Sequence, residues 1–258
     1  MPLHAGSSPA SAAMALAAAM APASVAHQLE TLADAQSRIE YAVYTQDARA
    51  LQASRTDLEA LTGDGEHAAL AAYFLGYAGF RLAQLAIDAN PDAAAGDLDA
   101  CIESAGDTLD LEPAMAEAHA LIAVCQGMRA ELSPITGVLD SRAAAGHLRK
   151  ARELEPDNPR IELLATIGLY RKAPAGDPQV AAGFEQALRL FAREKRPRAG
   201  WPEWGLAEAH ACLGSVYLAN GDTMRARNEL EHALLIAPDY VWAAELRRRL
   251  RALSPDAT

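Results

Sequence analysis

The sequence is poor in the residue types that build β-sheets. It holds only 4 Phe, 3 Trp and 7 Tyr in 258 residues, and it has few runs of Val or Ile. Strands are enriched in aromatic and β-branched side chains, so this scarcity disfavours a sheet. Half of the chain is nevertheless apolar (51%), and much of that content is Ala, the strongest helix former. The composition therefore predicts an all-α fold whose helices pack closely on small side chains, with ample apolar content for a core.

Positive charge is also scarce. The chain has 23 Lys and Arg against 34 Asp and Glu, which gives a formal net charge of −11 and a pI near 5.1. Proteins that bind nucleic acid neutralise its phosphates with clustered Lys and Arg, so we expect no nucleic-acid partner. Basic clusters at residues 193–198 and 247–251 lie near expected helix C-termini, where the helix dipole favours them. A docking patch for an acidic partner is the alternative interpretation.

Motifs for catalysis and cofactor binding are missing. The sequence has no HExxH motif, no glycine pattern for phosphates or dinucleotides after a strand, and no glycine-flanked nucleophilic serine. His119 and His210 occupy the same place in two similar segments, and neither has a second metal ligand at helical spacing. We interpret both as packing residues between helices. We expect a protein that is not an enzyme, with no cofactor and no metal site.

Cysteine is represented by three residues, Cys101, Cys125 and Cys212, which form no CxxC pair and no zinc-type spacing. Each is interpreted first as a small buried helix residue. If Cys101 lies on the second helix of one hairpin and Cys125 on the first helix of the next, their faces pack together. A disulfide between them is then geometrically allowed, and it would matter in an oxidising compartment.

The first 26 residues contain no Asp, Glu, Lys or Arg. Residues 12–23 form a short Ala/Met/Leu stretch, and Ser24-Val25-Ala26 offers the small residues that signal peptidase requires. The start lacks the usual positive charge. We expect an exported, periplasmic protein with a signal peptide over residues 1–26, and the alternative is an Ala-rich leader on a cytoplasmic protein. No later stretch reaches 18 apolar residues, so no integral membrane segment is expected.

The clearest internal pattern runs from Ala207 to Tyr240. It has a Leu-Gly pair, then an aromatic residue, then small and apolar residues ending in proline, at Leu213, Gly214, Tyr217, Ala226, Leu230, Ala233 and Pro238. This spacing resembles that of the tetratricopeptide repeat (TPR), L-G-x2-Y…A-x3-F…P, with Leu in place of Phe. Partial copies precede it: Leu75-Gly76 and Ile167-Gly168 repeat the Leu-Gly mark, and AEAHA occurs at residues 116–120 and 207–211.

The repeat length departs from the TPR pattern. Glu117, Glu162 and Glu208 open corresponding helices at separations of 45 and 46 residues, whereas a standard TPR unit has about 34. We expect the extra residues between the two helices of the second and third hairpins and after the second helix of the fourth. HEAT repeats have a natural period near this length, but the Leu-Gly and Ala…Pro marks favour TPR hairpins.

The resemblance implies a right-handed α-solenoid of TPR-like helical hairpins, because one repeat cannot bury its apolar face alone. We place the repeat domain at residues 27–253. Its expected hairpins span residues 27–63, 66–112, 114–156, 158–194 and 203–238, followed by a capping helix at 239–253 and a loose tail at 254–258.

The resemblance also implies a ligand groove, since the first helix of each TPR hairpin lines the concave face. The expected groove residues are Tyr73, Tyr77, Phe80, Glu117, Val124, Met128, Glu162, Leu169, Lys172, Glu208, Ser215 and Leu218. Aromatic residues at one end and a stripe of carboxylates favour a ligand with apolar groups and some positive charge. The alternative is that the glutamates serve helix N-termini.

These patterns together predict a non-catalytic scaffold that binds a protein or peptide partner in the concave groove of a solenoid. The alternative is a structural or self-associating subunit of a larger cell-envelope complex. The sequence gives no oligomeric state.

Overall fold

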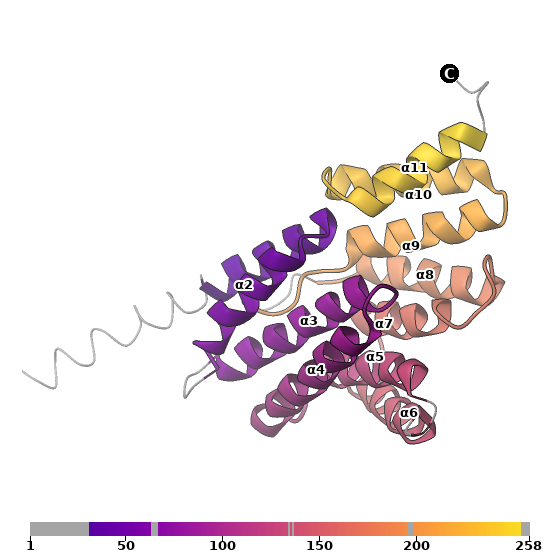
Figure 1. Cartoon of the computed structure of the whole chain (residues 1–258). Helices are drawn as coiled ribbons and strands as arrows, with labels where there is room; N and C mark the ends of the chain where they lie inside the picture. Colours follow the sequence, from indigo (N-terminus) through magenta and orange to yellow (C-terminus); the bar gives the residue numbers. More distant parts are fainter. Residues whose placement is uncertain (1–30, 63–66, 134, 136, 196–198, 254–258) are drawn as a thin grey trace, which may run out of the picture.

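The computed structural model describes residues 31–62, 67–133, 135, 137–195 and 199–253. Within these ranges every regular element is an α-helix, and no strand occurs (Figure 1). The expected leader and tail, residues 1–26 and 254–258, lie outside the described residues. The all-α prediction is confirmed.

The helices follow one another as antiparallel pairs that stack side by side (Figure 1). Residues 31–45 are helical and precede α2. The others are α2 (Ala48–Glu59), α3 (Ala68–Ala86), α4 (Pro91–Leu111), α5 (Ala116–Leu132), α6 (Gly137–Leu154), α7 (Pro159–Tyr170), α8 (Pro178–Phe191), α9 (Leu206–Ala219), α10 (Thr223–Ile236) and α11 (Val241–Leu253). Five hairpins and a last helix that packs on α10 make a right-handed α-solenoid.

The long repeat period comes mainly from long helices. In the second and third hairpins α3, α4, α5 and α6 have 19, 21, 17 and 18 residues, whereas α9 and α10 have 14 each. The expectation of long connections inside the second and third hairpins is therefore wrong: α4 and α6 begin soon after α3 and α5 end. The extra residues after the second helix of the fourth hairpin are present, at 192–205 between α8 and α9.

Side-chain caps fix where several helices begin. Asp47 accepts hydrogen bonds from the backbone N–H groups of Arg49 and Ala50. Asn90, Asn158 and Asp177 each cap a helix whose first residue is proline. Proline fits that position because its φ is already helical and its missing N–H would have no partner there. The first residue of each of these helices is therefore determined by the cap residue next to it and, in three of them, by the proline that follows the cap.

Glycine allows close approach at two of the Leu-Gly marks. A Cβ on Gly76 would lie 3.1 Å from the carbonyl oxygen of Cys101, so α3 packs directly on the backbone of α4. A Cβ on Gly214 would lie 2.8 Å from Leu230 Cγ on α10. Helix packing within a hairpin therefore explains the glycine at these two marks, whereas a Cβ on Gly168 would meet nothing within 4 Å.

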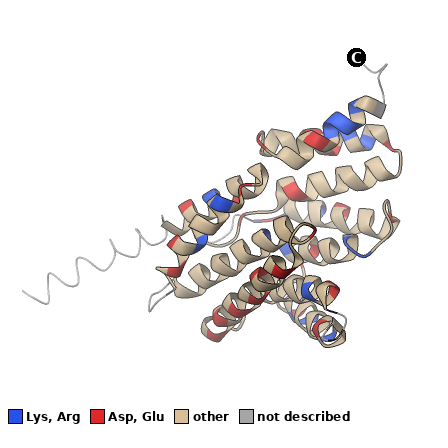
Figure 2. Cartoon of the chain, in the orientation of Figure 1, with Lys and Arg blue, Asp and Glu red and all other residues tan. Residues whose placement is uncertain are grey.

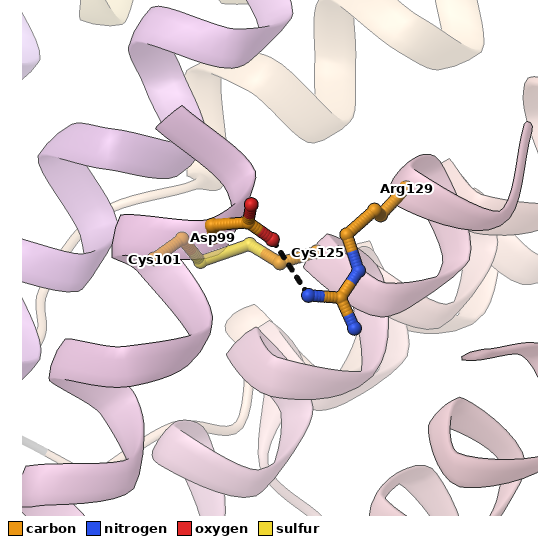
Figure 3. The surroundings of a disulfide bond; sticks show 4 residues. All are labelled: Asp99, Cys101, Cys125 and Arg129. Carbon is orange, nitrogen blue, oxygen red and sulfur yellow. Dashed lines mark hydrogen bonds and ion pairs between the residues drawn. A yellow bond between two sulfur atoms is a disulfide. The ribbon is translucent and has the colours of Figure 1, made fainter. Parts of the chain in front are cut away.

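A disulfide joins the second hairpin to the third. Cys101 on α4 and Cys125 on α5 are bonded, with their Cα atoms 6.6 Å apart. Figure 3 shows Arg129 reaching past this bond to Asp99, and the same guanidinium pairs with Asp140 on α6 at 2.6 Å. Three successive helices are thus linked covalently and by ion pairs. Cys212 is a buried free thiol.

No helix in the described part of the chain is both long enough and apolar enough to cross a membrane.

Candidate binding site

The inner side of the solenoid is organised around Arg81 on α3. Its side chain is 3% exposed, and its guanidinium forms an ion pair with the carboxylate of Glu208 on α9. It donates from Nη1 to Glu208 Oε1 (2.7 Å) and Gln84 Oε1 (2.7 Å), and from Nη2 to Glu208 Oε2 and the Tyr77 hydroxyl (2.8 Å). This arrangement connects the second hairpin to the fifth across 127 residues of sequence.

Trp204, in the connection between α8 and α9, fills the space beside these residues. Its ring stacks on Tyr77 with centroids 4.5 Å apart, and its indole N–H donates to the Tyr73 hydroxyl at 3.2 Å. Gly205 follows at φ +110°, a conformation that favours glycine. The connection therefore turns sharply after inserting its indole, and Figure 1 shows its last part passing between α2 and α3 in this view before α9 begins.

The predicted aromatic residues of the groove lie together, but in the core. Tyr73, Tyr77 and Phe80 are at most 1% exposed. Burial is also the main cause that raises the pKa of the Tyr77 hydroxyl well above its ordinary value. Trp204 stacks on Tyr77 and bonds to Tyr73, and a ligand could reach the three buried rings only if the surrounding side chains moved. Their role as ligand anchors stays a prediction.

The predicted carboxylate stripe is already bonded within the chain. Glu208 pairs with Arg81, Glu162 pairs with Arg152 at 2.9 Å, and Glu117 accepts from the Asn158 side chain at 2.7 Å. Burial raises the pKa of the Glu117 carboxyl above its ordinary value. A strongly cationic ligand would have to replace these internal partners.

The remaining predicted groove residues are dispersed. Val124, Met128 and Ser215 are buried, whereas Leu169 is 41% exposed. The Ser215 hydroxyl shares a hydrogen bond with the Tyr170 hydroxyl at 2.8 Å. These side chains therefore do not form a single open surface.

A pocket of about 320 Å³ lies where the first, second, fourth and fifth hairpins meet the start of the last helix. Its lining residues are Val43, Gln46, Arg81, Gln84, Leu85, Asp88, Ile167, Tyr170, Arg171, Glu208, Cys212, Tyr240 and Trp242. Tyr240 also contacts Tyr44 of the N-terminal helix, with ring centroids 4.9 Å apart. Residues from both ends of the chain therefore line one cavity.

The pocket offers binding groups but no activated nucleophile. Burial raises the pKa of the Cys212 thiol well above its ordinary value, so the unreactive protonated form dominates. Two arginines and two carboxylates among the lining residues balance in charge. The cavity therefore suits an uncharged or weakly charged group bound by aromatic contact and hydrogen bonds.

Sequence reasoning missed Arg81, Trp204 and Trp242. Arg81 is a single charged residue within a long apolar helix, and Trp204 is an aromatic residue in a Pro- and Gly-containing connection. Both patterns indicate a buried side chain that needs a specific hydrogen-bonding or ionic partner. The partners themselves lie too far away in sequence to be identified from it.

The stacked hairpins and their close-packing glycines define a TPR-like α-solenoid. No protein-family model and no curated protein matches the sequence. Among solved structures, a thermophilic TPR protein of Thermus thermophilus is similar, with TM-score 0.56 and 16% identity over 84% of this chain and 97% of that one. The assembly chaperone of RpL4 (residues 1–338) is matched with TM-score 0.35 and 15% identity over 88% of this chain and 99% of that one.

Proposed function

We propose that the protein is a non-catalytic scaffold that binds a peptide segment of a partner protein in the pocket between the N-terminal helix, α3, α7, α9 and α11. The observation that carries this proposal is the cavity lined by both ends of the solenoid. TPR-type folds commonly use such inner surfaces to bind protein segments.

The lining chemistry favours an apolar or aromatic side chain flanked by peptide groups. Tyr170, Tyr240 and Trp242 supply ring surfaces, while Gln46 and Gln84 carry amides that can both donate and accept hydrogen bonds. The Arg81–Glu208 ion pair neutralises its own charges at the base of this set. The sequence predicts a ligand with some positive charge. The pocket does not favour such a charge, because Glu208 is already paired with Arg81.

Peptide selection tests this proposal. A random peptide library panned on the purified protein should yield an apolar consensus, and calorimetry of one enriched peptide should show binding that Trp242→Ala weakens by about tenfold or more. Tyr41→Ala is the matched control, because Tyr41 is 59% exposed and does not line the pocket. Equal binding by the wild type and Trp242→Ala would show that the peptide does not bind in this pocket.

Self-association is a second candidate, and one surface feature favours it. Ile135, Val138 and Leu139, around the start of α6, are 91%, 69% and 67% exposed. Successive exposed apolar side chains often mark an interface. Light scattering should then show a dimer or larger species that a triple Ser variant converts to monomer. A wild-type monomer at high concentration would contradict this candidate.

We also propose that the protein is exported. The Cys101–Cys125 disulfide supports this compartment, because such bonds persist in oxidising surroundings. Intact mass of the protein from fractionated cells gives the test. A periplasmic chain that begins at His27 is expected, and a cytoplasmic chain that retains Met1 would contradict export.

A further inference from the structure

Three potential metal ligands meet on the outer part of the last hairpin. His210 comes from α9, while Glu229 and His232 come from α10. One ligand atom of each lies within 4.8 Å of the others, and His210 Nδ1 is 2.7 Å from Glu229 Oε2. The two imidazole rings have centroids 5.1 Å apart. We propose that His210, Glu229 and His232 form a binding site for a divalent transition metal, best matched by Zn²⁺.

The local structure explains why these side chains converge. Glu229 and His232 are three residues apart on α10, and residues at that spacing share a helix face. α9 packs antiparallel against α10, which brings His210 beside that face. His210 and Glu229 are partly buried, and His232 is exposed. Two ligands are therefore held in place by packing, while the third is free to change rotamer.

The donor set selects the class of metal. Two imidazoles and one carboxylate suit Zn²⁺ and neighbouring transition metals, whereas Ca²⁺ and Mg²⁺ prefer oxygen ligands throughout. Tetrahedral Zn²⁺ at bonds of about 2.1 Å places its ligands about 3.4 Å apart. The observed spacings lie on both sides of that value, with His210 Nδ1 and Glu229 Oε2 2.7 Å apart and no pair of the three ligand atoms beyond 4.8 Å. Binding therefore requires small shifts of these side chains. Three protein ligands leave a fourth position open for water or a donor group of another molecule.

The third hairpin provides an internal comparison. His119 is the counterpart of His210 in the AEAHA pentapeptide, and His147 and Lys150 are the counterparts of Glu229 and His232, counted back from Pro156 and Pro238. His119 and His147 are close, with their Nδ1 atoms 2.9 Å apart. The third position of this set is occupied by Lys150, whose positive charge would repel a metal ion. The same framework thus carries a complete ligand set in one hairpin and an incomplete set in the other.

Spacing within one helix could not reveal this site. His210 does contact side chains of the next helix, as a packing residue would, and the proposal adds metal binding to that role. No second ligand lies near His210 at helical spacing on α9. The other two ligands instead lie on the neighbouring helix, 19 and 22 residues further along.

Metal titration of the full chain, made without a histidine tag and stripped with a chelator, tests the proposal. Co²⁺ should bind at one equivalent with the intense visible absorption of a tetrahedral site, and Zn²⁺ should displace it. His232→Ala and Glu229→Gln should each weaken Zn²⁺ binding by about tenfold or more. His232 is exposed, so its removal should leave folding intact.

Two control variants locate the site. Glu231→Gln removes one negative charge, as Glu229→Gln does, but from an exposed position of α10 outside the ligand set. His147→Ala removes an imidazole from the position in the third hairpin that corresponds to Glu229. Both should bind Zn²⁺ as the wild type does. The proposal is overturned by a dissociation constant above about 0.1 mM, by binding that His232→Ala leaves unchanged, or by equal loss in either control.

Discussion

Arg81 holds its positive charge inside a cluster of aromatic rings. Its guanidinium carbon lies 4.8 Å from the Tyr77 ring centroid, 5.0 Å from Phe80 and 5.5 Å from Trp204. Cation–π attraction therefore adds to the ion pair with Glu208. A buried pair of this kind adds little net stability over an apolar replacement, but loss of one partner leaves an uncompensated charge.

Replacement of Arg81 by Met is expected to lower the free energy of unfolding by about 3–5 kcal/mol, because Glu208 would stay buried without a cation. Urea denaturation monitored by circular dichroism gives the measurement. The double variant Arg81→Met/Glu208→Gln should recover much of the loss. A single variant that loses less than about 1 kcal/mol would show that the ion pair is not compensating a buried charge.

Glu117 contributes a pH dependence of stability whose sign follows from the burial of its carboxyl group. Burial, the largest cause, raises the pKa of its carboxyl above the ordinary value of 4.5. Between pH 4.5 and the raised pKa, the folded protein binds more protons at Glu117 than the unfolded chain does. The contribution of Glu117 to the free energy of unfolding therefore falls as pH rises through that range.

The variant Glu117→Gln lacks this titration. Its unfolding free energy relative to wild type should therefore rise with pH above 4.5 by at most about 1.4 kcal/mol per pH unit, then level off. Denaturant titrations from pH 4 to pH 8 measure the difference. A difference that stays constant over this range, or falls, would contradict the raised pKa.

Among the elements, α3 and α4 approach each other closely at Gly79. A Cβ there would lie 3.0 Å from the carbonyl oxygen of Asp97 and 3.3 Å from the backbone nitrogen of Cys101. Backbone atoms cannot rotate away as a side chain can. The close packing of this hairpin therefore depends on glycine.

Gly79→Ala is expected to destabilise the protein by about 1–3 kcal/mol through overpacking. Gly106→Ala on α4 is the matched control, because a Cβ there meets nothing within 4 Å. That control should be neutral or stabilising by up to about 1 kcal/mol, since alanine favours helix. Thermal and urea unfolding measure both, and equal effects of the two substitutions would refute the packing argument.

At the scale of the whole molecule, contacts between distant hairpins set this chain apart from a simple linear solenoid. In many repeat proteins each unit touches only its neighbours, and stability is a sum of local terms. Here Arg81 meets Glu208, Tyr73 meets Trp204 and Tyr44 meets Tyr240. The ends of the chain are therefore coupled through the inner surface.

Charge is distributed unevenly over this molecule. Figure 2 shows acidic residues along α4 and basic residues toward the end of α11. Two of the acids on α4, Asp97 and Asp99, pair with Arg55 on α2 and Arg129 on α5. Part of the acidic surface thus serves contacts between hairpins.

Tyr240→Ala tests the coupling of the two ends. Loss of its ring contact should speed amide hydrogen exchange in residues 31–45 by about tenfold or more, although they lie almost two hundred residues away. Met224→Ala, at a residue 75% exposed on α10, should leave that exchange unchanged. Exchange that accelerates in α10 and α11 alone would mean that the ends unfold independently.

The sequence determined the helices of this protein, their pairing into hairpins and the glycines that let them pack, because caps, prolines and apolar spacing act over a few residues. The resemblance to TPR hairpins added the prediction that Tyr73, Tyr77, Phe80 and Glu208 line the concave face. Only the tertiary structure decided that Trp204 packs on Tyr77 and bonds to Tyr73, and that Glu208 pairs with Arg81. Those contacts depend on the small rotation between successive hairpins, which accumulates along the solenoid and is not written in any single repeat.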